Sequence, residues 1–213
     1  MTAPHRRPAN RLPSAAVAAF LLALTLRTPS APATVAEQRA RLPPAAECEH
    51  PVEGKWKAIV FRQNYQMWHE FLLEVRPVPG STSELVGSIR VDTWFGGAEQ
   101  SEPGPCRIER FKGSMEGHGS FKDGQVLFGG GPFKLEEMLC GDASSVSYAP
   151  DQFSGRLEPE RQEFQAVNND GSTAVNEPAV FRRVSCFDDA PVTADKAGVK
   201  PPPFFPERRE GGC

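Results

Sequence analysis

Residues 67–94 read MWHEFLLEVRPVPGSTSELVGSIRVDTW and carry the clearest structural signal in the chain. Mostly apolar side chains recur at every second position of residues 67–75 and again of residues 85–93, which is the period of a β-strand with one buried face. Residues 77–83 between the two runs favour a turn, because proline fixes φ and glycine permits positive φ. The stretch therefore predicts a β-hairpin.

Similar short runs fill the rest of residues 54–187, and turn signals such as Asp123-Gly124 separate them. No amphipathic helix longer than about ten residues competes with them. We predict an all-β domain, an antiparallel closed barrel of about eight strands, with a β-sandwich as the alternative. The barrel is favoured because closure removes exposed strand edges. The further strand candidates are residues 54–61, 106–115, 119–121, 125–128, 133–138, 153–157, 163–167 and 179–186.

The chain divides into four segments by composition. Residues 1–33 carry only basic charge, an apolar run of twelve residues and a small-residue end at Ala33, which is the layout of a secretory signal peptide. Because roughly 20 residues are needed to cross a bilayer, we expect cleavage near Ala33, export to the periplasm or the extracellular space, and no remaining membrane anchor. We expect residues 34–53 to be a linker or at most one helical turn, residues 54–187 the barrel domain, and residues 188–213 an extended, Pro-rich flexible tail.

Composition argues against several classes of function. Four of the 24 Lys and Arg residues and none of the 27 Asp and Glu residues lie in residues 1–33, so the exported chain has 20 basic against 27 acidic residues. An acidic chain without a basic stripe is not expected to bind nucleic acid. The chain has no Gly-x-Ser-x-Gly elbow and no Cys-x-x-Cys pair. We therefore expect neither an enzyme nor a protein that holds a metal or another cofactor.

Export makes disulfides the default state of the five cysteines. Spacing alone does not fix their connectivity. Cys48 and Cys186 bracket the part of the chain that is expected to fold, and Cys106 and Cys140 lie within it. We predict the pairs Cys48–Cys186 and Cys106–Cys140. Cys213 is then the odd thiol, available for a cross-link to another chain.

Gly54-Lys55-Trp56 at the head of the first strand, together with Arg182 or Arg183 on the last, resembles the lipocalin pattern and, more broadly, the calycin barrels. The resemblance covers residues 54–187. It implies that Gly-x-Trp opens the barrel and that an arginine of the last strand stacks over Trp56 at the closed end. A guanidinium on an indole is a cation–π contact worth about 0.5 to 2 kcal/mol. Gly54, Arg182 and Arg183 are therefore candidate structural residues.

In a barrel, one face of each predicted strand points inward. Such a cup suits a small, mostly apolar ligand, and His69 is the one histidine placed to orient it. In the alternative, the barrel is filled by its own side chains, and His69 is a core or rim histidine with an ordinary hydrogen bond. The candidate ligand-binding residues are Trp56, His69, Phe71, Leu73, Ile89 and Val91.

Trp68 and Trp94 lie on the mixed polar and apolar faces of two neighbouring predicted strands, not on the faces expected to point into the barrel. They form either a cross-strand pair, which stabilises a sheet by about 0.2 to 1 kcal/mol, or an exposed platform for a glycan or a protein. We predict an exported, non-enzymatic binding module that holds a small apolar ligand. The alternative is a protein- or glycan-binding interaction protein, secreted or part of the envelope, with a filled core.

Overall fold

The computed structural model describes residues 34–105 and 109–187. The predicted signal peptide, the Pro-rich tail, Cys106 and Cys213 lie outside the described residues. The helices are α1 (Val35–Ala40) and three short 3₁₀ turns, η1 (Gln63–Tyr65), η2 (Ala143–Ser145) and η3 (Pro159–Arg161). Within the described ranges, no helix is long and apolar enough to cross a membrane.

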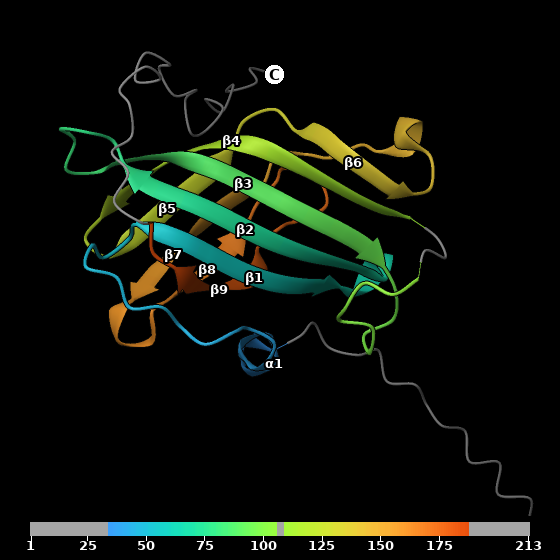
Figure 1. Ribbon diagram of the computed structural model, residues 1–213, viewed down its shortest axis with the longest axis horizontal. Helices are drawn as coiled ribbons and strands as arrows, with labels where there is room; N and C mark the ends of the chain where they lie inside the picture. Colours follow the sequence, from blue (N-terminus) through green and yellow to red (C-terminus); the bar gives the residue numbers. More distant parts are fainter. Residues whose placement is uncertain (1–33, 106–108, 188–213) are drawn as a thin grey trace, which may run out of the picture. The chain divides into compact units, whose positions relative to one another are not determined.

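The strands of the described residues form one antiparallel sheet, and eight of them close into a barrel (Figure 1). They are β1 (Gly54–Arg62), β2 (Met67–Pro77), β3 (Glu84–Phe95), β4 (Arg110–Lys122), β5 (Gln125–Gly130), β6 (Lys134–Cys140), β7 (Gln152–Glu158), β8 (Glu163–Asn168) and β9 (Glu177–Ser185). Eight of them pair in the order β1-β2-β3-β4-β5-β7-β8-β9, and β9 pairs with β1 to close the ring. β6 lies outside the ring and pairs with residues 110–114 of β4. The predicted closed barrel is confirmed, and the sandwich alternative is wrong.

The predicted hairpin consists of β2 and β3, which pair from Met67 opposite Phe95 to Pro77 opposite Leu85. Alternate residues of both strands are buried, because successive side chains of a strand point to opposite faces of the sheet. One boundary differs from the sequence prediction. Residues 110–122 form a single long strand, β4, rather than two separate strands.

Two glycines of β4 leave room for aromatic rings. A Cβ atom on Gly113 would lie 2.2 Å from the ring of Phe133, and one on Gly117 would lie 2.4 Å from the ring of Phe128. Both distances are far inside van der Waals contact, so the backbone and the rings approach this closely only because the residues are glycines.

Aromatic side chains from opposite walls meet in the middle of the barrel. The ring centroids of Phe71 on β2 and Phe153 on β7 are 5.2 Å apart, although three strands separate β2 from β7 in either direction around the ring. Phe181 on β9 contacts Phe153 at 4.8 Å and Phe164 at 4.7 Å between centroids. The barrel's own side chains therefore fill it at this level.

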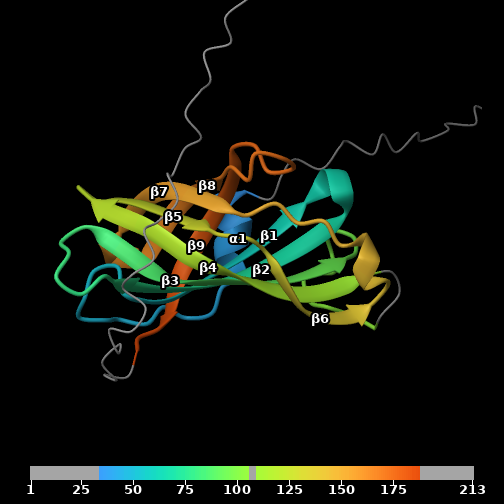
Figure 2. The same cartoon turned by 90° about the horizontal axis from the view of Figure 1, so that it is seen from above.

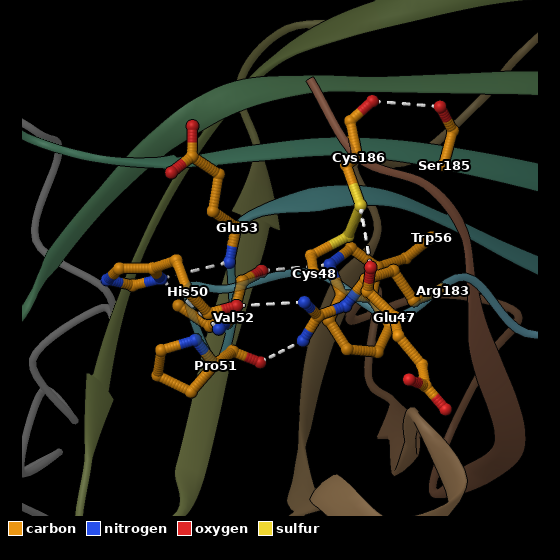
Figure 3. The surroundings of a disulfide bond; sticks show 10 residues. All are labelled: Glu47, Cys48, His50, Pro51, Val52, Glu53, Trp56, Arg183, Ser185 and Cys186. Atoms are coloured by element: carbon orange, nitrogen blue, oxygen red, sulfur yellow. Dashed lines mark hydrogen bonds between the residues drawn. A yellow bond between two sulfur atoms is a disulfide. The ribbon is translucent and has the colours of Figure 1, made fainter. Parts of the chain in front are cut away.

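A contact between the first and last strands closes one end of the barrel (Figure 3). The guanidinium carbon of Arg183 lies 4.6 Å from the centroid of the Trp56 ring. Arg183 also donates hydrogen bonds to the backbone carbonyls of His50, at 2.8 Å, and Pro51. The Trp56 indole donates to the Val52 carbonyl at 2.9 Å. The expected arginine over Trp56 is confirmed, and it is Arg183.

Gly54 and Arg182 have different structural roles. Gly54 has φ 137°, and a Cβ atom there would lie 2.8 Å from the carbonyl oxygen of Ser185, so β1 begins beside β9 only with glycine at this position. The Arg182 side chain lies on the opposite face of β9 from Arg183. It donates two hydrogen bonds to the Glu163 carboxylate, the shorter one from Nη2 at 2.6 Å. Arg182 therefore joins β9 to β8 rather than covering Trp56.

Residues 34–53, expected to be a linker with at most one helical turn, contain the short helix α1. α1 begins with a capping box between Thr34 and Glu37 and lies on the outside of β1 and β9 (Figures 1 and 2). The side-chain amide of the buried Gln38 donates to the Pro178 carbonyl at 2.9 Å and accepts from the Val180 amide at 2.8 Å. The segment packs through the buried Gln38 as well as through the apolar Leu42 and Val52, and these few apolar side chains gave no helical period in the sequence.

A disulfide joins this segment to the end of the barrel. The predicted Cys48–Cys186 bond is present and links the residues before β1 to the residue after β9 (Figure 3). Cys140 also takes part in a disulfide. Its predicted partner, Cys106, lies outside the described residues.

Trp68 and Trp94 are a structural pair. They are directly opposite each other on β2 and β3, their ring planes differ by 9°, and both are buried. They belong to a small outer cluster that also contains Leu42 and Val180 and lies between the barrel wall and the segment before β1. The alternative of an exposed aromatic platform is therefore wrong.

Replacement of Arg183 tests the closed end. We expect Arg183→Met to lower the free energy of unfolding by about 3 kcal/mol, because it removes a buried cation–π contact and leaves two carbonyl groups without a charged donor. Arg156→Met, on an exposed position of β7, is the matched control and should change it by less than about 0.5 kcal/mol. Urea unfolding measures both variants. Equal effects of the two would contradict the closing role of Arg183.

Candidate functional site

Buried polar side chains gather at the end of the barrel opposite Trp56, which we call the mouth. They come from the end of β1, the start of β2, the end of β3, the end of β8, the start of β9 and the adjoining loops. Polar side chains are uncommon in a protein interior unless other polar groups hold them. The mouth cluster consists of the buried Arg62, His69, Thr93, Asp151 and Asn168 and the partly buried Tyr148, Asp170 and Glu177.

Arg62, the last residue of β1, is the centre of the charged part of this cluster. It is 5% exposed, and its Nε donates to Glu177 at 2.8 Å. Its Nη2 lies 3.8 Å from an oxygen of Asp170 and 4.0 Å from one of Asp151, but it makes no hydrogen bond. Burial opposes the charged form, but the neighbouring carboxylates, Glu177 first, raise the pKa of Arg62. Arg62 therefore stays positively charged, and its buried Nη2 nitrogen makes no hydrogen bond.

Asp151 is the last residue of the loop between β6 and β7 and is fully buried. Its Oδ1 accepts from the Asn168 side-chain amide at 2.6 Å, and its Oδ2 accepts from the Tyr148 hydroxyl at 2.8 Å. Burial raises the pKa of Asp151 to about 6, although both hydrogen bonds and Arg62 favour the ionised form. Burial also raises the pKa of Tyr148 well above its ordinary value, so at neutral pH this pair is a carboxylate and a phenol.

His69 lies on β2 and is fully buried. Its Nδ1 is 3.0 Å from the Thr93 hydroxyl, and its Nε2 has no hydrogen-bond partner. Burial and then the charge of Arg62 hold the pKa of His69 well below its ordinary range. The ring is therefore a neutral imidazole, and its Nε2 donates or accepts according to the tautomer.

Aromatic rings cover the mouth, and we call Phe111, Phe133 and Tyr148 the lid. Phe133 and Tyr148 stack with centroids 4.6 Å apart, and Phe111 lies 6.2 Å from each of them. Phe133 precedes β6 and Tyr148 follows it, so both aromatic side chains come from the segments that flank β6, the strand outside the ring of eight. Both are half-buried, whereas Phe111 is buried on β4. The lid therefore has one fixed ring and two rings on loops.

The six predicted ligand-binding residues are all buried in the barrel, but they lie at different depths. His69 belongs to the mouth cluster. Phe71 and Val91, opposite each other, are one step further in, and Trp56, Leu73 and Ile89 lie beyond them toward the closed end. Two hollows on the outside of the barrel, of about 510 and 330 Å³, are not lined by any of these six residues.

Sequence reasoning missed most of the mouth cluster. Arg62 continues the inward positions of Trp56, Ala58 and Val60, so strand parity was a usable signal for it. Asp151 and Asp170 lie in segments that the sequence marks as turns, where an acidic residue is ordinarily solvated. No local pattern shows that these turns fold over the barrel end.

The acidic residues of the mouth surround Arg62 and do not form a metal site. In the described part of the chain, no group of three or more His, Cys, Asp or Glu side chains is arranged to hold a metal ion. The Asp170 carboxylate accepts from the Thr173 hydroxyl and from two backbone amides of its own loop. The cluster therefore suits hydrogen bonding rather than metal coordination.

Comparison of the chain with protein-family models, with curated proteins and with solved structures gives no match. The class of protein therefore follows from the geometry alone. A closed, eight-stranded antiparallel barrel with Arg183 over Trp56 is consistent with a calycin-like fold.

Titration of Asp151 predicts a pH dependence of stability. Its pKa is raised in the folded state, to about 6 from 3.8, so the folded protein holds this proton more tightly than the unfolded chain does. The stabilising effect of the proton is fully present below about pH 4 and is lost as the pH rises through about 6, a change of about 3 kcal/mol. Asp151→Asn removes this titration and keeps both hydrogen bonds, because the Tyr148 hydroxyl can also accept.

We therefore expect the free energy of unfolding of the wild type, minus that of Asp151→Asn, to fall by about 3 kcal/mol between pH 4 and pH 7. Urea unfolding at one-unit intervals measures the difference. Asp123→Asn, in the exposed turn between β4 and β5, is the matched control and should give a flat difference. A flat difference for Asp151→Asn would contradict the raised pKa of Asp151.

Proposed function

We propose that the protein is an exported, non-enzymatic binding module that holds a small, mostly apolar ligand at the mouth of a lipocalin-like barrel. The observation that carries the proposal is a pair of buried polar atoms without hydrogen bonds, His69 Nε2 and Arg62 Nη2, beneath an aromatic lid. A buried polar group without a partner costs about 1 to 3 kcal/mol. A ligand that bonds to either atom recovers part of this cost.

The filled core sets the depth of the proposed site. Because Phe71 and Phe153 meet across the middle of the barrel, the ligand has its place above them, between these rings and the lid. The apolar surface there comes from rings, and the polar surface comes from the mouth cluster. A mostly apolar site with a few convergent polar groups is the usual composition of a small-molecule site.

The lid supports exchange of a ligand. The Tyr148 hydroxyl donates to Asp151, and its ring contacts Phe133, Phe111 and His69. A ligand that displaces Tyr148 breaks this hydrogen bond and replaces its ring contacts with its own. The cost of entry is therefore of the order of one hydrogen bond.

Two observations support export. Residues 1–33 have the order of a basic, an apolar and a small-residue region. The Cys48–Cys186 disulfide is of a kind that persists in oxidising compartments and is rare in the cytosol.

A second candidate function is binding of a protein or a glycan through the outer surface. The ring contacts that fill the middle of the barrel favour it, since a filled barrel needs no interior ligand. The two candidates differ in whether the isolated protein carries a small molecule.

Native mass spectrometry of the protein, secreted through an oxidising compartment, tests the proposal. We expect an extra mass that leaves on denaturation. The double variant His69→Phe/Thr93→Val should lose most of this mass while remaining folded, because replacing both partners of a buried hydrogen bond by apolar groups is nearly neutral. His118→Phe, on the outer face of β4, is the matched control and should retain it. A bare wild-type monomer would favour the second candidate.

A further inference from the structure

We propose that the mouth binds an uncharged phenolic ligand, a planar ring with a hydroxyl group, and that Tyr148 occupies the place of this ligand in the free protein. The inference rests on the proposed function, because it names the chemical class that the same site takes. It follows from the donors and acceptors, the charge and the ring geometry of the mouth.

The hydrogen-bonding groups of the mouth favour a ligand group that both donates and accepts a hydrogen bond. Asp151 Oδ2 accepts from the Tyr148 hydroxyl at 2.8 Å. Arg62 Nη2, 4.0 Å from the other oxygen of the same carboxylate, is buried and has no acceptor. Tyr148 therefore satisfies the acceptor but leaves the donor unused. The backbone holds the Tyr148 hydroxyl where it does not accept from Nη2. A free ligand hydroxyl has no such tether, so we infer that it donates to Asp151 from a position nearer to Arg62 Nη2 and accepts from it, which gains one hydrogen bond over Tyr148.

The charge of the mouth favours a neutral ligand. One guanidinium, that of Arg62, lies among the carboxylates of Asp151, Asp170 and Glu177. The local excess of negative charge opposes a carboxylate ligand. An ammonium ligand would lie against the Arg62 cation and would offer no acceptor to its unused donor. Either ion would also lose its hydration on entry, which is far more costly than burying a hydroxyl group.

The rings of the mouth favour a planar ligand. The Phe133 ring stacks on Tyr148 with an angle of 27° between the planes, and the His69 ring makes an edge-to-face contact with Tyr148 at 6.1 Å between centroids. A ligand ring that takes the place of the Tyr148 ring inherits both contacts. A single six-membered ring matches the space that Tyr148 vacates.

Five small probes that share one aromatic ring test the ligand class at pH 7. They are p-cresol, 4-methylanisole, toluene, benzoate and benzylammonium, titrated into the intact protein and followed by NMR. We expect p-cresol to bind about tenfold more tightly than 4-methylanisole, because only the phenol donates to Asp151. We expect toluene, which has neither a donor nor an acceptor, to bind more weakly still. Benzoate and benzylammonium should bind more weakly than p-cresol by at least the same factor.

Two conservative variants test the role of each partner. Asp151→Asn should abolish the preference for p-cresol over 4-methylanisole, because the new amide donates to the ligand oxygen and no longer accepts from it; Asp123→Asn should keep the preference. Tyr148→Phe should raise the affinity for p-cresol about tenfold, because no Tyr148–Asp151 bond then has to break. Tyr65→Phe, at the exposed tyrosine of the chain, is its matched control and should leave the affinity unchanged.

Each outcome decides one part of the inference. Tighter binding of benzoate or benzylammonium than of p-cresol would overturn the neutral ligand class. A preference for p-cresol that survives in Asp151→Asn would overturn the claim that the ligand hydroxyl donates a hydrogen bond to Asp151. An unchanged affinity in Tyr148→Phe would overturn the claim that Tyr148 stands in the ligand's place. If none of the five probes binds, this inference fails, whereas the proposed function fails only if the native protein carries no extra mass.

Discussion

Closure of the barrel depends on the seam between β1 and β9. Backbone pairing at this seam is confined to residues 55–57 of β1 and 182–185 of β9, which is far less than the pairing of β2 with β1 or with β3. The two strands are the first and the last of the ring, so bringing them together costs more chain entropy than forming any hairpin of the ring. Side chains therefore supplement the seam. Arg183 covers Trp56, the Cys48–Cys186 disulfide joins the flanking segments, and Gln38 bonds the part of β9 beyond the pairing.

The closed ring determines where a polar site can exist. Rings from opposite walls fill the middle, and Arg183 seals one end, so the mouth is the remaining place where polar groups from several strands converge. Burial there raises the free energy of every charged group, and the cluster offsets this by placing Arg62 among carboxylates and by bonding Asp151 to Asn168 and Tyr148. His69 Nε2 and Arg62 Nη2 remain without hydrogen bonds. A structure optimised for stability alone would leave neither of them unbonded.

Much of the fold was predictable because its signals are local. The period of residues 67–75 and 85–93 identified the hairpin, and Gly54, Trp56 and the arginines near 182 indicated how the ring closes. The packing of residues 34–53 on the barrel was hard to predict for a physical reason: the amide of Gln38 and a disulfide help to anchor the segment, and neither produces an apolar period. The mouth was harder to predict, because Tyr148, Asp151 and Asp170 come from loops and converge only after the ring has closed. His69 was identified as an interior polar group, but its environment was not.

The two ends of the barrel differ in how they respond to a ligand. At the closed end, a disulfide, a cation–π contact and hydrogen bonds to the backbone all act on the same few residues. At the mouth, β6 leaves the wall, since β5 pairs with the second half of β4 and β6 with the first half. The wall between β4 and β7 is therefore completed there by loops, and these loops carry Phe133 and Tyr148. Displacement of these two rings breaks ring contacts and one hydrogen bond to Asp151, but it breaks no backbone pairing between the eight strands of the ring. The mouth can therefore open while the seam, and with it the barrel, stays closed.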